Sequence, residues 1–303
     1  MTAPDWIAVD WGTSALRLWA IGRDGEVIAA RRSDSGMAAV PQGGFEAALM
    51  DLLDGLLPEA GRVGVLCCGM VGARQGWREA PYVPVPCVPP GMADAMPVPA
   101  HDPRLAVGIL PGLRQDRPAD VMRGEETQVA GFLAGEPHFD GVLCLPGTHT
   151  KWVHVSAGEV VSFRTFMTGE MFALLSRGSV LRHAVDPDGW DADAFAEAVG
   201  DALSRPHTLS AALFSIRAEG LLAGLDPAQA TARLSGLLIG IELAGARPHW
   251  LGQDVRVLGT GRMARAYAAA LTAQGAQAAC LPGEDMALRG LIAARRAVTA
   301  GAS

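Results

Sequence analysis

The chain has 303 residues, of which 50% are hydrophobic and 19% are charged, and its net charge is −7. At about 150 residues per domain, this length predicts two domains. The acidic balance argues against a nucleic-acid partner and against binding to a membrane, since both depend on an excess of Lys and Arg.

The sequence predicts neither a targeting segment nor a membrane span. Asp5 and Asp10 interrupt the region where a secretory leader would have its apolar core. No stretch approaches the roughly 18 uninterrupted apolar residues of a transmembrane helix. The five cysteines include no C-x-x-C pair, which favours buried, reduced thiols in a cytoplasmic protein.

The first half begins with three predicted strands, separated by a polar loop and an Asp-Gly turn: 6–9, 15–21 and 26–30. A helix over 43–57 and a buried strand over 63–68 follow. The proline-rich stretch 81–118 predicts an extended segment with one short strand near 105–110.

The second half repeats this order after a short helix over 124–133, with three more strands around a polar loop and a glycine turn: 141–145, 151–156 and 159–165. Apolar residues at steps of three and four predict helices through most of 168–246. Two further strands each precede a helix: 254–258 and 277–281. The repetition predicts two similar domains facing one another, over residues 1–138 and 139–303.

The loop between the first two strands carries Asp10, Gly12, Thr13 and Ser14. Gly12 lets backbone N–H groups approach an anion, and the two hydroxyls add donors. Asp10 at a strand end suits Mg²⁺ held through water. The alternative is an ordinary hairpin turn.

The equivalent loop of the second half carries Gly147, Thr148 and His149, and Lys151 follows it as the only lysine of the chain. Two such loops facing across a cleft predict a polyphosphate site, with the ammonium within reach of a phosphate. The alternative is a surface turn with a solvated lysine.

Two acids, Glu125 and Glu126, open the helix that follows Arg123. Acids in a first turn complement the helix dipole, which is a sufficient structural reason for them. They are also candidates for a general base, since a hydroxyl that attacks phosphorus needs a nearby carboxylate to accept its proton.

The turn Gly259-Thr260-Gly261 lies between a predicted strand and a helix and continues to Ala264 as G-x-G-x-x-A, with Glu284 some 20 residues on. This spacing is typical of dinucleotide-binding proteins, but no βαβαβ order precedes it. A turn that supports an adenosine, or a plain helix start, remains open. The sequence contains no Walker G-x-x-x-x-G-K-[ST] motif and no histidine spacing typical of zinc.

Several strings together resemble the 2-dehydro-3-deoxygalactonokinase family of the actin/hexokinase/sugar-kinase superfamily. They occur in order along the chain: VDWGT (9–13), GMVG (69–72), GW (76–77), APY (80–82), VMRGEETQ (121–128), PGTH (146–149), KWV (151–153), FRT (163–165), MTGE (167–170) and LSGLLIG (234–240). The resemblance implies an α/β, two-domain actin-like (ribonuclease H-like) sugar kinase fold, with duplicated mixed-sheet domains and a central nucleotide cleft. It implies ATP-dependent phosphorylation of the 6-hydroxyl of 2-dehydro-3-deoxy-D-galactonate in galactonate catabolism, with Mg²⁺, ATP and the sugar acid as the small molecules bound.

The resemblance also implies roles for single residues. The phosphates of ATP would be contacted by Gly12, Thr13, Ser14, Gly147, Thr148, His149 and Lys151. The adenosine would lie at Gly259, Thr260 and Gly261. The sugar acid would be bound by Trp77, Arg78, Arg123 and Arg164, since a guanidinium matches a carboxylate with two hydrogen bonds. Asp10 would organise Mg²⁺, and Glu125, ahead of Glu126 and then Asp10, would be the catalytic carboxylate.

Three alternatives remain. The first is that the substrate is the gluconate epimer or another 2-keto-3-deoxy sugar acid. One hydroxyl separates these compounds, and the sequence does not show which residue contacts it. A second alternative is a non-catalytic nucleotide-binding regulator of the same superfamily. The third is an NAD-dependent dehydrogenase, which would use the turn at Gly259.

Overall fold

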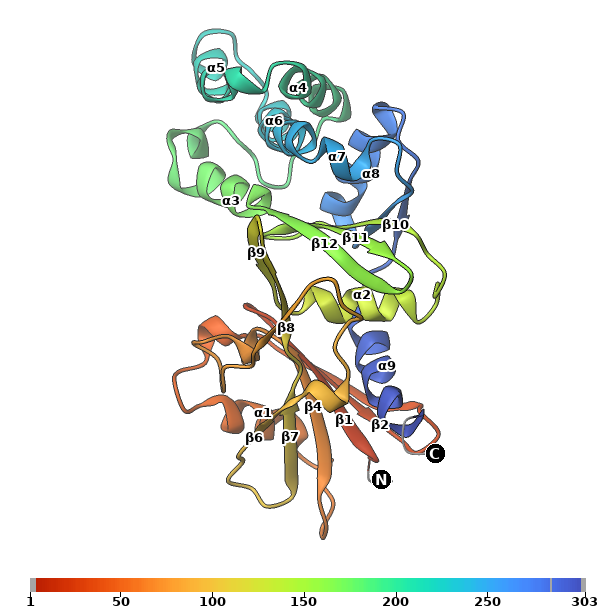
Figure 1. Ribbon diagram of the computed structural model, residues 1–303. Helices are drawn as coiled ribbons and strands as arrows, with labels where there is room; N and C mark the ends of the chain where they lie inside the picture. The colour runs from red at the N-terminus through yellow and green to blue at the C-terminus, as the bar shows by residue number, and fades with distance from the viewer. Residues whose placement is uncertain (1–3, 284, 301–303) are drawn as a thin grey trace. The chain divides into compact units, whose positions relative to one another are not determined.

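The computed structural model describes residues 4–283 and 285–300, with residues 297–300 described by their backbone alone (Figure 1). The chain forms two compact units. The first consists of the described residues of Met1–Phe139, Ser156–Ser162 and Gly283–Ser303, and the second of Asp140–Val155 and Phe163–Pro282. This grouping differs from a division into residues 1–138 and 139–303, because the last helix and the turn after Ser156 belong with the first unit.

The main sheet of the first unit has the strand order β3-β2-β1-β4-β7-β6. Its strands are β1 (Trp6–Trp11), β2 (Leu16–Ile21), β3 (Val27–Ser33), β4 (Val63–Gly69), β6 (Met96–Val98) and β7 (Leu105–Ile109). β1 is antiparallel to β2 and parallel to β4, and β4 is parallel to β7. The meander expected over residues 6–30 is therefore confirmed.

Strand β1 is buried on both faces because a helix covers each of them. Ile7 and Val9 face the core formed with helix α1 (Phe45–Leu53), and Ala8 faces the core formed with helix α9 (Met286–Ala300). Alternation along the strand then places Asp10 on the same face as Ala8. The helix predicted over 43–57 is shorter than expected, since it ends at Leu53.

Helix α9 packs against helix α2 (Glu125–Leu133) at two glycines (Figure 1). A Cβ added to Gly290 would lie 1.8 Å from the carbonyl oxygen of Thr127, and one added to Gly131 would lie 2.0 Å from that of Met286. This approach, together with Leu291 against the sheet, gives the last helix its place in the first unit.

The proline-rich stretch contains more strands than expected. β5 (Tyr82–Pro84), β8 (Gly112–Asp116) and β9 (Ala119–Met122) form a separate sheet, and β6 borders the main one. Pro84 in β5 and Pro97 in β6 are accommodated because both are short edge strands.

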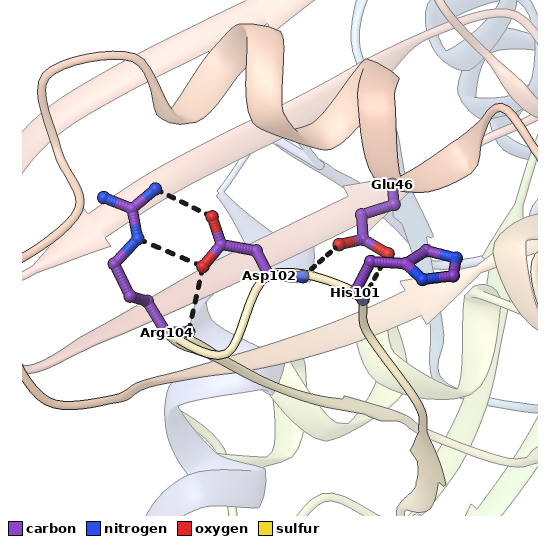
Figure 2. A network of polar contacts seen from close by, with 4 residues as sticks. All are labelled: Glu46, His101, Asp102 and Arg104. Carbon is purple, nitrogen blue, oxygen red and sulfur yellow. Dashed lines mark hydrogen bonds and ion pairs between the residues drawn. The ribbon is translucent and has the colours of Figure 1, made fainter.

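A polar network holds the loop before β7 against helix α1 (Figure 2). Glu46 in the first turn of α1 accepts the N–H groups of His101 and Asp102, each at 2.8 Å. Asp102 in turn pairs with Arg104 at 2.7 Å, and this partner lowers the pKa of Asp102 to about 2.

The second unit repeats the strand order of the first, as β12-β11-β10-β13-β14. The strands are β10 (Gly141–Leu145), β11 (Thr150–Ser156), β12 (Glu159–Phe166), β13 (Val255–Leu258) and β14 (Ala278–Leu281). β10 is antiparallel to β11 and parallel to β13, as β1 is to β2 and β4. The internal duplication expected from the sequence is present in the topology.

Helices provide the rest of the second unit. They are α3 (Thr168–Gly178), α4 (Ala192–Ser204), α5 (Leu209–Leu222), α6 (Pro227–Gly245), α7 (Arg247–Trp250) and α8 (Gly261–Ala273). α6 is the central one, with eleven buried residues. It packs between the sheet core and a second core shared with α4 and α5. Among the described residues, no helix is both long and apolar enough to cross a membrane.

We expect Gly290→Ala to destabilise the first unit by about 1–3 kcal/mol, because the new methyl group overlaps a backbone carbonyl that cannot move freely. Gly200→Ala is the matched control, since a Cβ there meets nothing within 4 Å in helix α4. It should leave stability unchanged or raise it by up to about 1 kcal/mol. Urea unfolding of both variants measures this, and equal midpoints would contradict the close helix contact.

Candidate active site

In the first unit, polar side chains gather where β1 and β4 end. Asp10 lies opposite Arg17 on β2 and opposite Cys68 on β4. Its Oδ2 forms an ion pair with Arg17, and its Oδ1 lies 3.8 Å from the Cys68 Sγ. The Asp10 side chain keeps 13% of its surface exposed, so its carboxylate reaches solvent at the edge of the sheet.

The loop after β1 is a tight turn held from one side. The Gly12 N–H donates to the Ala15 carbonyl at 2.9 Å, and Met37 and Ala38 donate to the carbonyls of Gly12 and Thr13. The side chains of Thr13 and Ser14 are exposed. The Gly12 N–H is already used within the turn, whereas the side-chain hydroxyls of Thr13 and Ser14 are exposed.

The start of helix α2 lies against the end of β4. Gly124 has φ +107°, and a Cβ on it would lie 3.2 Å from the Cα of Gly69. Its N–H donates to both carboxylate oxygens of Glu126, at 2.8 and 2.7 Å. Glu126 is 1% exposed, so it caps its own helix from inside the protein.

Burial, together with the charge of Glu125, raises the pKa of Glu126 to about 8. The hydrogen bonds from the backbone and the charge of Arg123 oppose this rise. Cys68 lies within electrostatic reach of both Asp10 and Glu126, and burial together with these two acids raises the pKa of its thiol. Asp10, Cys68 and Glu126 therefore form one cluster.

Glu125 differs from its neighbour in exposure. It is half-buried, and its Oε2 accepts the Arg123 N–H at 3.1 Å. Adjacent residues on a helix point about 100° apart. One acid therefore points into the protein and caps the helix, while the other remains partly exposed.

The residues expected to bind a sugar acid lie in different surroundings. Arg123 is 7% exposed; its Nη2 donates to the Ala80 carbonyl at 2.7 Å, and its guanidinium lies 4.2 Å from the centre of the Tyr82 ring. Its Nη1 is buried and has no hydrogen-bond partner among the described residues. Trp77 packs edge-on against Trp11 with ring centres 6.3 Å apart.

Arg78 and Arg164 both have exposed side chains. Arg78 follows Trp77 in the first unit, whereas Arg164 lies on the part of β12 that belongs to the second unit. Burial lowers the pKa of His249, and the charges of His154 and Arg164, which lie within electrostatic reach, lower it further.

In the second unit, the loop 146–149 rests on the start of helix α3. A Cβ on Gly169 would lie 2.2 Å from the carbonyl oxygen of Gly147, and the Glu170 N–H donates to the Thr148 carbonyl at 2.9 Å. Glu170 Oε2 also lies 2.7 Å from Nε2 of His149. Thr148 and His149 remain exposed, so the loop presents them while its backbone is fixed from behind.

Lys151, the first charged residue after this loop, is 4% exposed. Its Nζ donates to the His149 carbonyl at 3.2 Å. The ammonium is therefore a buried charge directly beside the exposed loop.

Sequence reasoning missed a buried carboxylate behind this loop. Glu242 on α6 is 2% exposed and accepts from Trp152 Nε1 at 2.7 Å and from the Tyr267 hydroxyl at 2.6 Å. Thr168 Oγ1 donates to the same carboxylate. The available signal was an acid within the apolar run 237–243, one turn after Leu238 on the buried face.

A cavity of about 400 Å³ opens beside the turn after β13. Its lining is largely apolar with a few hydroxyls, and includes Thr168, Phe172, Trp190, Ser235, Arg262, Met263 and Tyr267. Gly259, Thr260 and Gly261 immediately precede two of these residues but do not line the cavity themselves. The guanidinium of Arg262 lies over the Trp190 ring and donates to the carbonyls of Pro187 and Asp188, which fixes the rim. Glu284 lies outside the described residues.

No group of three or more His, Cys, Asp or Glu side chains that could hold a metal ion occurs in the part of the chain that the structure describes. Mg²⁺ commonly takes only one or two carboxylates and completes its shell with water and phosphate. A single partly exposed carboxylate such as that of Asp10 is compatible with that mode of binding.

The comparisons with known proteins agree on one family. A family model described as 2-keto-3-deoxy-galactonokinase matches residues 10–294. A probable 2-dehydro-3-deoxygalactonokinase of Rhizobium meliloti (strain 1021) is 42% identical over 309 residues, which cover 98% of each chain. The chain belongs to the 2-keto-3-deoxy-galactonokinase family.

Two further comparisons support this family. The 2-dehydro-3-deoxygalactonokinase of Escherichia coli (strain K12) is 33% identical over 297 residues, covering 97% of this chain and 98% of the relative. The crystal structure of a putative 2-dehydro-3-deoxygalactonokinase protein from Sinorhizobium meliloti has a TM-score of 0.90 at 41% identity, covering 97% of this chain and 99% of that one.

A remote likeness concerns the fold alone. Component A of the (R)-2-hydroxyglutaryl-CoA dehydratase of Acidaminococcus fermentans has a TM-score of 0.53 at 13% identity, covering 98% of this chain and 99% of that one. With the duplicated mixed sheets, this confirms the expected α/β actin-like fold class for a 2-keto-3-deoxy-galactonokinase.

The buried Glu126 predicts a pH dependence of stability. A glutamate in the unfolded chain has a pKa of 4.5, whereas Glu126 in the folded chain has a pKa of about 8. Between pH 4.5 and pH 8, folding is therefore accompanied by the uptake of a proton at Glu126. Its contribution is fully present below pH 4.5 and is lost as the pH rises through about 8. The slope is at most about 1.4 kcal/mol per pH unit.

We therefore expect Glu126→Gln to flatten the pH dependence of unfolding. The amide cannot ionise, and its oxygen still accepts from Gly124. The free energy of unfolding of the variant minus that of the natural chain should be larger at pH 9 than at pH 5. Urea unfolding of both proteins at both pH values measures this difference. A difference between the two proteins that is the same at both pH values would show that Glu126 does not change its proton in this range.

Proposed function

We propose that this chain transfers the γ-phosphoryl group of ATP to the 6-hydroxyl of 2-dehydro-3-deoxy-D-galactonate, in the cytoplasm and with Mg²⁺. The observation that carries the proposal is the 42% identity to a probable 2-dehydro-3-deoxygalactonokinase over 98% of both chains. The side chains of the candidate site support it, because exposed hydroxyls, a half-buried carboxylate and a buried ammonium are the kinds of group that phosphoryl transfer uses.

Glu125 is the proposed general base. A base must reach the hydroxyl proton of the substrate, and Glu125 is half-buried whereas Glu126 is 1% exposed. Glu126 already accepts from Gly124 with both oxygens. Its proposed part is to fix the start of α2, from which Glu125 projects.

In the second unit, the cavity behind Arg262 and Trp190 is the proposed binding site for the adenine ring of ATP. An apolar cavity of about 400 Å³ with a few hydroxyls suits a planar base with polar edges. The exposed Thr148 and His149 would contact the phosphates, with the ammonium of Lys151 beside them. The turn 259–261 would border the adenosine from the start of α8.

In the first unit, Thr13 and Ser14 would donate to phosphate oxygens. Asp10 would hold Mg²⁺ through water, and the ion would neutralise phosphate charge during transfer. Since Arg17 pairs with Asp10, it would hold this carboxylate in place at the strand end.

We expect arginine side chains to bind the carboxylate of the sugar acid. Arg78 has an exposed guanidinium, and the buried Nη1 of Arg123 still lacks a hydrogen-bond partner among the described residues. Trp77, the residue before Arg78, packs on Trp11. Arg164, which is exposed in the second unit, is the remaining candidate.

A coupled ADP-release assay tests the substrate. With Mg²⁺-ATP, we expect turnover of 2-keto-3-deoxygalactonate and none of galactonate or glycerol, since the family's substrate carries the keto-deoxy group. Comparable turnover of 2-keto-3-deoxygluconate would widen the assignment to both epimers. ATP binding without turnover of any of these acceptors would refute the kinase assignment and favour a regulator.

Glu125→Gln should lower kcat by about 10²–10⁴-fold, because the amide accepts no proton. ATP affinity should remain within about threefold, since the side chain keeps its size and its contact with Arg123. Steady-state kinetics and calorimetric ATP titration measure the two effects.

The matched controls are Glu126→Gln and Glu136→Gln. The first should retain more kcat than Glu125→Gln, because the buried acid acts through helix position alone. The second removes an exposed acid just beyond the far end of α2 and should leave the kinetics unchanged. A larger loss of kcat in Glu126→Gln than in Glu125→Gln would exchange the two roles.

A further inference from the structure

The carboxylate of Glu242 connects three elements of the second unit. Its Oε1 accepts from Trp152 on β11 at 2.7 Å, and its Oε2 accepts from Tyr267 on α8 at 2.6 Å. Thr168 at the start of α3 is the third donor. The Thr150 hydroxyl lies 2.9 Å from that of Tyr267 and extends the network to the first residue of β11.

These donors belong to two neighbouring features. Thr168 and Tyr267 line the 400 Å³ cavity. Thr150 and Trp152 follow the exposed loop 147–149 directly, and Gly169 beside Thr168 supports that loop from behind. Glu242 therefore lies behind the cavity wall and behind the loop at the same time.

Packing alone does not explain an acid at this position. A buried carboxylate costs free energy unless its oxygens are hydrogen-bonded, and an apolar side chain of similar volume would fill the same space more cheaply. Here the carboxylate satisfies three donors at once, and each donor is fixed in return. Among the described residues, no Lys or Arg is recorded as a partner of Glu242, so hydroxyls and an indole carry the interaction.

We propose that Glu242 is a positioning residue that sets the loop 147–149 relative to the cavity wall, so that the base and the phosphates of one nucleotide are bound together. This rests on the proposed function in that the nucleotide is ATP. Glu242 would not touch ATP itself. Its effect would pass through Thr168 and Tyr267 on one side and Thr150 on the other.

The test compares nucleotide binding in the full chain with and without this carboxylate. Isothermal titration without any sugar acid gives the Kd for ATP and for adenosine. We expect Glu242→Gln to raise the Kd for ATP by at least about tenfold and the Kd for adenosine by less than about threefold. The reason is that the amide places an N–H donor where two hydroxyls now donate. The loop would then no longer be held in a fixed position relative to the cavity wall.

The matched control is Trp250→Phe. Trp250 lies in the same core, is 3% exposed and donates only to the backbone of Leu243, at 2.8 Å. It should lower the urea midpoint at least as much as Glu242→Gln while leaving the Kd for ATP within twofold. If it weakens ATP as strongly as Glu242→Gln does, general destabilisation explains the loss and the inference is wrong.

Tyr267→Phe provides a second variant if Glu242→Gln folds poorly. It removes one donor and the bond to Thr150 but leaves two donors on the carboxylate, so we expect a smaller loss of ATP affinity. The double variant Glu242→Gln with Tyr267→Phe should bind ATP no more weakly than Glu242→Gln alone, because both changes act on one network. Losses that multiply would show two independent effects and overturn the inference.

The outcomes separate the two proposals. If the natural chain binds ATP but phosphorylates no sugar acid, the proposed function fails while the role of Glu242 stands on its binding data. If the natural chain binds ATP and Glu242→Gln binds it within twofold, the inference alone fails. A natural chain that binds no ATP refutes both.

Discussion

Strands β1 and β4 are buried on both faces, and this constraint decides where the first unit can place polar chemistry. One face of β1 meets the core with α1 and the other meets the core with α9. Within the sheet, a charged side chain would lose its hydration with no partner to replace water. Polar residues are therefore admitted only where the strands end, and Asp10, Cys68 and the start of α2 gather there.

The same constraint operates in the second unit with a different solution. β10 is fully buried, and the buried polar residues of β11 each have a partner. Thr150 and Trp152 reach the Glu242 network, and Lys151 reaches the His149 carbonyl. Both units have a polar loop after the first strand of the meander, but the first unit braces it with residues 36–38 and the second with the start of α3.

Local features were predictable from the sequence, whereas features that depend on distant partners were not. The two meanders follow from alternating apolar residues around short polar loops, and their repetition indicated the duplicated sheets. The place of α9 beside α2 depends on Gly131 and Gly290, which are far apart in the chain and unremarkable singly. The burial of Arg123 likewise depends on Tyr82 and the Ala80 carbonyl, so an arginine that reads as a free ligand-binding group is mostly engaged within the protein. Glu242 was visible as an acid in an apolar helix, but its donors come from α3, β11 and α8.

Glu125 and Glu126 are neighbours in the first turn of α2, yet they differ in burial and in the tasks proposed for them. A base must be reachable, and the geometry that holds it must be protected from solvent; a single side chain cannot satisfy both demands. Because neighbouring helix positions point about 100° apart, one acid can be buried against Gly124 while the next remains half-exposed. The buried acid then exists mostly in its protonated form below pH 8, which spares the exposed one the repulsion of a second full negative charge. Under the proposed roles, position and protonation together would give the two identical side chains different tasks.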